Sequence, residues 1–438
     1  MRGSQTVSAH SLERERETSA VHPLEFFLLV VSLMVFSEGI LPRLLSSDAT
    51  SDGSALLRYL WLPIYALAFA GIVWKARVVL QASIRLPFLM ALLVLCAVSF
   101  TWSIDAGLTQ RRSFAIIMTT AAGLFLGTRY SWKTMLRALA MVWLILALSS
   151  ALTGLLVPDF GRDQTVHIGA WQGLFFEKNQ LGGMMARAAT VAAFLVLMDR
   201  KFRSVWMGLL IVCTLLVVLS TSITAILGLV IGLGAIGICA LMKRGLATGL
   251  VTLWIGGLAA GVGIFVLVLV PDIVFESLGR DMTLTGRTDI WITLIDYIQE
   301  RPVLGYGYGA FWADGSDPGN WVRETLQWDA PTAHNSWIEV TLALGFVGLG
   351  LLLADFVITV ARALLSSVNT WVGVFALAFL AQFFLFSLSE SASLQQNSIV
   401  WLIYVAIAAK LARRPKGIAL IKPARSLPAR RLGEPVSL

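Results

Sequence analysis

Few polar side chains in this chain are available for chemistry, because charged residues make up only 14% of the sequence. The most informative are one histidine, His334, and four basic residues spread along the chain: Arg112, Lys178, Arg187 and Arg287. Histidine is well suited to take a proton near neutral pH, and the planar arginine fork binds phosphate oxygens in pairs. A site that joined them could stabilise a phosphate leaving group and remove the proton of an attacking hydroxyl.

The sequence gives little support for metal, nucleotide or thiol chemistry. Two of the four histidines, His10 and His22, lie in a polar N-terminal tail, and no group of residues has metal-ligand spacing. Neither a Walker loop nor a dinucleotide-binding fingerprint is present. The three cysteines, Cys96, Cys213 and Cys239, lie in apolar segments, which favours packing over a disulfide or a metal site. We therefore expect no metal and no cofactor.

The elements that position these residues belong to a membrane protein. Of the 438 residues, 57% are hydrophobic and the mean hydropathy is +0.78. A soluble protein carries about a quarter charged residues, and a disordered chain is poor in apolar ones, so both classes are excluded. The net charge of +8 is a weak indication of nucleic-acid binding, because the positions of the cations matter more than their number. We expect no nucleic-acid partner.

The apolar residues gather in segments that are long enough to cross a bilayer. A membrane-spanning helix needs roughly 20 apolar residues, because all its backbone groups must be satisfied internally. The sequence predicts about twelve such helices: 24–44, 56–74, 86–101, 113–129, 137–157, 180–198, 204–220, 223–242, 250–270, 336–360, 371–388 and 397–412. We expect an all-α transmembrane domain over 24–412, between a cytoplasmic N-terminal tail at 1–23 and a basic cytoplasmic tail at 413–438. Residues 1–22 are polar and no small-residue cleavage site follows, so no cleaved signal peptide is expected.

The distribution of lysine and arginine predicts the orientation of these helices. With both termini in the cytoplasm, most of the 34 basic residues fall in inner connections. The four basic residues singled out above then fall on the outer side, against the trend. Arg187 lies about 7 residues into a predicted span, where a guanidinium costs on the order of 2.5–3.5 kcal/mol unless it is paired or faces water. Arg112 and Lys178 could instead reach lipid phosphates, and Arg287 could form a surface salt bridge.

The longest outer connection, at 271–335, has the composition of a folded segment. Its aromatic residues are numerous, and apolar residues recur at helical spacing: Ile290, Trp291, Leu294, Ile295 and Ile298. This spacing predicts an amphipathic helix over 286–300 that ends before Pro302 and lies on the membrane surface. The run from Gly305 to Gly309 lacks side chains at alternate positions, which would allow a ligand or another backbone to approach closely.

Four segments resemble, in order, motifs of the O-antigen ligase and Wzy-type polysaccharide polymerase superfamily. The clearest is His334-Asn335 with Gly345 and Gly348 after it. The others are Trp102-Ser103-Ile104-Asp105, the run Lys178-Asn179-Gln180-Leu181-Gly182, and the run from Gly286-Arg287 through Trp291 to Pro302 and Gly307. Together they cover about residues 100–350.

The resemblance implies a fold similar to the lipid-dependent glycosyltransferases of the GT-C class, in the bacterial inner membrane. It implies metal-independent transfer, at the periplasmic face, of a glycan from undecaprenyl pyrophosphate to an acceptor hydroxyl. By the match of motifs, His334 and Arg287 would be catalytic. Lys178, Asn335 and Trp291 match positions in the family motifs and would bind the pyrophosphate and the glycan. Arg187 and Arg112 would bind them too, an expectation that rests only on where these two residues lie in the sequence.

We expect a polymerase of the exopolysaccharide-polymerase (ExoQ-like) branch, because the run Phe176-Glu177-Lys178-Asn179 resembles that branch. It would join undecaprenyl-pyrophosphate-linked repeat units of an exopolysaccharide. The expected partners are the lipid-linked donor and acceptor, membrane lipids and a chain-length co-polymerase. An O-antigen ligase that transfers the glycan to lipid A-core is the alternative, because it would use the same site. A polysaccharide or lipid transporter is less favoured, because the two halves of the sequence show no obvious similarity.

Overall fold

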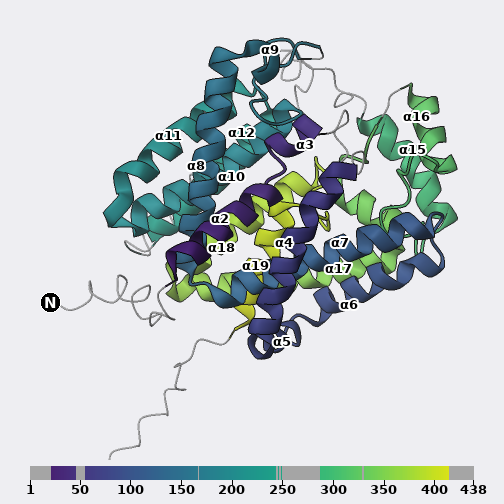
Figure 1. The fold of residues 1–438 in the computed structure, drawn as a ribbon, viewed down its shortest axis with the longest axis horizontal. Coiled ribbons are helices and arrows are strands. Elements are labelled where there is room, and N and C mark those ends of the chain that lie inside the picture. Colours follow the sequence, from purple (N-terminus) through teal and green to yellow (C-terminus); the bar gives the residue numbers. More distant parts are fainter. Residues whose placement is uncertain are drawn as a thin grey trace, which may run out of the picture.

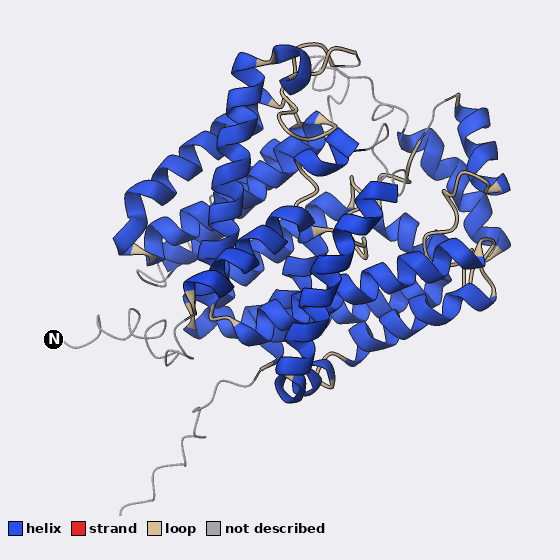
Figure 2. Cartoon of the chain, viewed as in Figure 1, coloured by secondary structure: helices blue, strands red, loops and turns tan. Residues whose placement is uncertain are grey.

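The computed structural model describes residues 21–45, 55–165, 167–242, 245, 248, 287–327 and 330–413. Over these ranges the chain is built of helices and connections, without strands (Figure 2). The predicted all-α fold is therefore confirmed for the part of the chain that the structure describes.

The helices follow the predicted spans closely. The first group is α2 (Pro23–Phe36), α3 (Ile40–Leu45), α4 (Ala55–Trp74), α5 (Ala76–Ser83), α6 (Pro87–Val98), α7 (Ala106–Arg129), α8 (Trp132–Leu156) and α9 (Pro158–Gly161) (Figure 1). The second is α10 (Lys178–Met198), α11 (Arg203–Leu219), α12 (Ile223–Met242), α15 (Arg287–Glu300), α16 (Asp317–Leu326), α17 (Ser336–Asn369), α18 (Trp371–Ser387) and α19 (Ile399–Ala412). The predicted span at 250–270 lies outside the described residues.

Among the described helices, five are long and apolar enough to cross a membrane: α8, α10, α11, α12 and α17. The pair α4 and α5, bent by 92° between Trp74 and Ala76, would make a sixth. Four further apolar helices are shorter, namely α2, α6 with the turn after it, α18 and α19. The protein is thus a multi-pass membrane protein, while twelve spans and the GT-C fold remain predictions.

Contacts between the helix ends agree with the predicted alternation. On the predicted inner side, Arg137 at the start of α8 pairs with Asp199 after α10 at 2.7 Å. On the predicted outer side, the hydroxyl of Tyr308 donates to the carbonyl of Leu394, before α19, at 2.7 Å. Each contact joins connections that alternation assigns to one side of the bilayer. The side that faces the cytoplasm remains a prediction.

Two buried helices form the centre of the molecule. α10 packs against α8, α11, α12 and α18, and α19 packs against α7. Gly123 and Gly127 of α7 face α19, and a Cβ atom at Gly127 would lie only 2.5 Å from the carbonyl oxygen of Ala406. Small residues four apart allow two membrane helices to approach closely. This packing fixes α7, whose N-terminal turns carry Arg112.

α17 is broken at Gly345. Its φ of +64° and ψ of −169° are not helical, and an L-residue with a side chain rarely adopts this φ. In an unbroken helix the N–H groups of Phe346 and Val347 would donate to the carbonyls of Leu342 and Ala343. The break leaves these four groups without a helical partner, which is costly in a membrane.

The segment after α15 enters this break and satisfies all four groups. The carbonyls of Pro302 and Val303 accept from the two freed N–H groups, at 2.8 and 3.3 Å. The N–H groups of Tyr306 and Gly307 donate to the two freed carbonyls, at 2.8 and 3.0 Å. Gly305 lies against the same stretch of α17, where a side chain would collide with its backbone. The glycine-rich run therefore serves the close backbone approach expected from the sequence, and we call this contact the α17 interlock.

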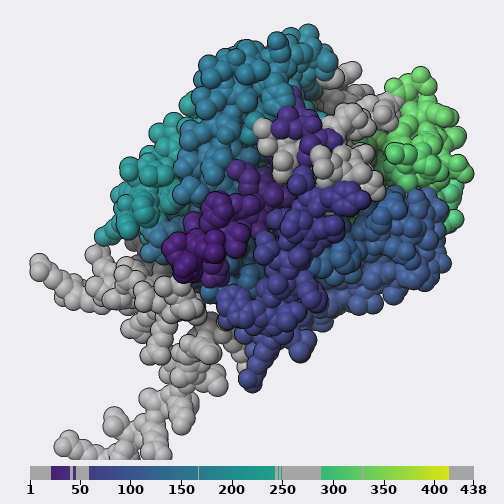
Figure 3. Space-filling model, viewed as in Figure 1, coloured from purple at the N-terminus to yellow at the C-terminus, as the bar shows by residue number. Residues whose placement is uncertain are grey.

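α15 forms where the sequence predicted a helix and ends before Pro302. Part of its apolar face, however, lies against protein, while Ile295 is 48% exposed. Ile290 and Leu294 are fully buried beside Phe311 and Leu342. The predicted membrane-surface position of these two residues is therefore wrong, because the face packs on α16 and α17. The α15 and α16 pair forms a lobe at one edge of the molecule (Figure 3).

We predict that Gly345→Ala lowers the free energy of unfolding by about 1–3 kcal/mol, because a side chain at positive φ is strained and would collide with Val303. The matched control is Gly350→Ala in the same helix, where a Cβ atom would contact nothing within 4 Å. The measurement is the thermal unfolding midpoint of each purified variant in one detergent. Equal midpoints for the two variants would contradict the role given to the break.

Candidate active site

A cavity of about 300 Å³ lies where the predicted outer ends of the helices meet. Its walls come from α7, α10, α17 and α18 and from the connections before α10, α17 and α19. Charged and polar groups on these walls include Arg112, Arg187, His334, Glu339 and Glu390. The cavity thus unites residues that are far apart in the sequence.

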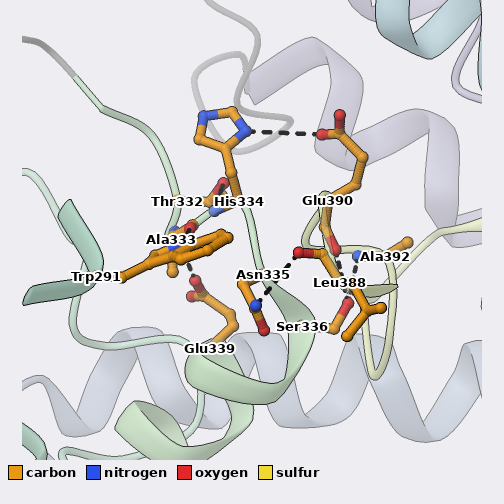
Figure 4. Close-up of polar contacts among 10 residues, drawn as sticks. All are labelled: Trp291, Thr332, Ala333, His334, Asn335, Ser336, Glu339, Leu388, Glu390 and Ala392. Atoms are coloured by element: carbon orange, nitrogen blue, oxygen red, sulfur yellow. Dashed lines mark hydrogen bonds and ion pairs between the residues drawn. The ribbon is translucent and has the colours of Figure 1, made fainter. Parts of the chain in front are cut away.

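His334 lies directly before α17 and is held through its backbone (Figure 4). Its φ is +47°, a left-handed conformation in which histidine is enriched among non-glycine residues. On the preceding residue, the Ala333 carbonyl accepts from the Trp291 indole at 2.9 Å, and the Ala333 N–H donates to the Glu339 carboxylate at 2.9 Å. The His334 N–H donates to the Thr332 hydroxyl at 3.3 Å. These contacts fix the direction of the imidazole, which lines the cavity.

The connection after α18 supplies the second charged group beside the histidine. The Glu390 carboxylate lies 3.6 Å from His334 Nδ1 (Figure 4). Ser336, in the first turn of α17, fixes this connection. Its hydroxyl donates to the Glu390 carbonyl at 2.7 Å and accepts from the N–H groups of Ala392 and the following residue, at 2.9 and 3.0 Å.

Arg187 carries a buried positive charge in the cavity wall. Its side chain is 6% exposed, and the guanidinium lies over the Phe386 ring, 4.1 Å from the centroid. Among the described residues its Nε has no hydrogen-bond partner, and the Glu390 carboxylate interacts with it electrostatically. A buried guanidinium with an open donor is well suited to bind an anionic oxygen.

Arg112 completes the basic wall from the side of α7. It lines the cavity and donates to the carbonyl of Gly309, at the end of the glycine-rich run. Its charge also acts on the Glu339 carboxylate. Arg112 therefore links α7 to the segment that forms the α17 interlock.

Three other predicted site residues, Lys178, Asn335 and Trp291, lie outside the cavity lining. Lys178 is buried and donates to the hydroxyl of Thr221 at 3.3 Å. Asn335 caps α17 and donates to the carbonyl of Leu388 at 3.3 Å, while Trp291 holds the residue before His334. Arg287 begins α15, but its side chain lies outside the described part of the chain.

Sequence reasoning missed two acidic groups of this site. Glu339 lies in the first turn of a predicted span, and its proximity to Ala333 depends on the turn at His334. Glu390 lies in the short connection at 388–398, where the run Ser389-Glu390-Ser391 between two apolar spans was the available signal.

Comparison with known proteins supports the resemblance found in the sequence. A family model described as O-antigen ligase matches residues 208–353, which contain His334 and Gly345. The chain is also 26% identical over 340 residues to the exopolysaccharide production protein ExoQ of Rhizobium meliloti (strain 1021), covering 74% of this chain and 73% of that protein. The chain is therefore similar to the O-antigen ligase family over this region and to ExoQ over most of its length. The predicted resemblance is thereby confirmed, and the α17 interlock and His334 lie in the region that the O-antigen ligase model covers.

We predict that Ser336→Ala destabilises the protein by about 1–3 kcal/mol, because one carbonyl and two N–H groups, all at least partly buried, lose their partner. Ser367→Ala is the control, since that hydroxyl donates to Leu364 within the same helix and is exposed. Thermal unfolding in detergent measures the difference. An effect no larger than that of the control would show that Ser336 does not fix the connection.

Proposed function

We propose that this protein is a polysaccharide polymerase that joins undecaprenyl-pyrophosphate-linked repeat units of an exopolysaccharide. The reaction would take place at the periplasmic face of the bacterial inner membrane, with both termini in the cytoplasm. The observation that carries this proposal is the convergence of His334, Arg112 and Arg187 on one cavity at the predicted outer helix ends. The name of the Rhizobium relative supports the exopolysaccharide assignment.

In the proposed reaction a hydroxyl of the acceptor unit attacks the anomeric carbon of the donor glycan. A new glycosidic bond forms as the bond between the anomeric carbon and the pyrophosphate oxygen breaks, and the bonding pair leaves with that oxygen. His334 takes the hydroxyl proton, which is typically worth about 10²–10⁴-fold in rate. Arg187 and Arg112 stabilise the negative charge that builds on the leaving group, so the reaction needs no metal.

The cavity also offers apolar surface beside its charged groups. Phe175, Met184, Val340 and Phe386 line it together with the arginines and the histidine. Such a mixed lining suits a substrate whose pyrophosphate is joined to a polyprenyl chain. Trp312 and Tyr308, which also line the cavity, offer ring faces for sugars.

We predict that His334→Ala and Arg187→Gln each reduce polymer formation at least about 100-fold in a complemented deletion strain. Arg287→Ala is expected to do the same by the motif match. The control is His167→Ala, in the connection between α9 and α10 and outside the cavity lining. Normal polymer from a correctly inserted His334→Ala variant would remove the histidine from the chemistry.

The alternative is an O-antigen ligase, which the description of the matching family model favours. A deletion strain distinguishes the two activities, because they consume the same donor and make different products. We predict loss of high-molecular-weight exopolysaccharide and unchanged lipopolysaccharide. Bare lipid A-core together with unattached polymer would instead support the ligase. The measurement is gel analysis of both glycans from one strain.

A further inference from the structure

Glu390 is a charged group of the cavity that the proposed reaction does not use, and it lies beside the imidazole of His334. Its carboxylate lies 3.6 Å from His334 Nδ1, and its side chain is 27% exposed. A hydrogen bond would be shorter than this distance, but catalytic contacts often tighten only when the substrate is bound. Glu390 therefore faces Nδ1 of the imidazole.

The backbone on both sides of this contact is tied to one helix end. Asn335 and Ser336 directly follow His334 and bind the carbonyls of Leu388 and Glu390, respectively (Figure 4). The histidine and the glutamate therefore cannot move apart without breaking hydrogen bonds at the start of α17. This arrangement fits a permanent pair better than a chance surface contact.

The charges around the imidazole explain what such a pair would do. When His334 takes a proton it becomes a cation, and the two nearby guanidiniums oppose that change. A carboxylate beside Nδ1 compensates for them and holds the Nδ1 proton, so that Nε2 keeps its lone pair for the incoming hydroxyl. Among the described residues, the ionisable groups that line the cavity with His334 are Glu38 before α3, Arg112 on α7, Glu177 and Arg187 at α10, Tyr308 before α16, Glu339 on α17, and Glu390.

We propose that Glu390 is a positioning residue that holds His334 with its proton on Nδ1 and stabilises the imidazolium formed when Nε2 accepts the acceptor's proton. This inference rests on the proposed function of the same site. The transferred proton moves from the acceptor oxygen to Nε2, Glu390 stays ionised throughout, and the proton leaves to water after the glycan has moved.

The test compares Glu390→Gln with the wild type and with Glu324→Gln, whose side chain is exposed on α16 and outside the cavity lining. Each purified protein in proteoliposomes receives lipid-linked repeat units extracted from the deletion strain, and polymer formation is measured against pH. Glutamine still accepts from Nδ1–H but lacks the charge. We expect kcat to fall at least about 10- to 100-fold, the range found when the hydrogen-bond partner of a metal-ligating histidine is removed, with KM for the lipid-linked unit nearly unchanged. The acid limb of the rate profile should move to lower pH, because the imidazolium loses a stabilising charge.

A second readout does not depend on turnover. The chain has four histidines, so the ¹⁵N resonances of His334 are assignable by comparison with His334→Ala. We expect a neutral imidazole protonated on Nδ1 in the wild type and loss of that preference in Glu390→Ala, with Glu390→Asp restoring it in part. An unchanged tautomer together with an unchanged pH profile would overturn the role of Glu390. If His334→Ala itself remained active, the proposed function would fail instead, so the two failures are distinguishable.

Discussion

Four backbone hydrogen bonds at the break in α17 hold the candidate site together. A membrane helix does not tolerate unpaired backbone groups, so the break at Gly345 requires the segment 302–307 to lie against it. The same segment continues into Tyr308, which binds the connection before α19, and into Gly309, which accepts from Arg112. One interlock therefore sets the relative positions of α7, α17 and the connection that carries Glu390.

The positions of the charged groups in the cavity depend on the helices that this interlock fixes. Arg187 is buried, and its Nε has no hydrogen-bond partner among the described residues. Burying a cation in a membrane protein costs free energy unless a ligand or a nearby carboxylate compensates for its charge. His334 adopts a left-handed conformation that its neighbours enforce through Ala333, Thr332 and Asn335. Backbone strain and buried charge of this kind are concentrated at functional sites. Both features fit a cavity that is preorganised for a phosphate and for one proton transfer.

Much of the architecture could be predicted from the sequence, because apolar segments of membrane length and the caps around them are local signals. His334, Arg112 and Arg187 were also predicted as site residues, and the structure brings these three to one cavity. The buried face of α15 was misassigned, because an amphipathic pattern does not distinguish a membrane surface from a protein surface. The direction of Lys178 and the roles of Glu339 and Glu390 depend on contacts between distant segments, which spacing along the chain does not reveal.

The most direct measurement is a cryo-electron microscopy structure of the protein in nanodiscs with an undecaprenyl-pyrophosphate analogue. We predict that the pyrophosphate lies within hydrogen-bond distance of Arg187 and Arg112, with His334 Nε2 facing the anomeric position. A pyrophosphate bound elsewhere, with the cavity of His334 empty, would contradict it.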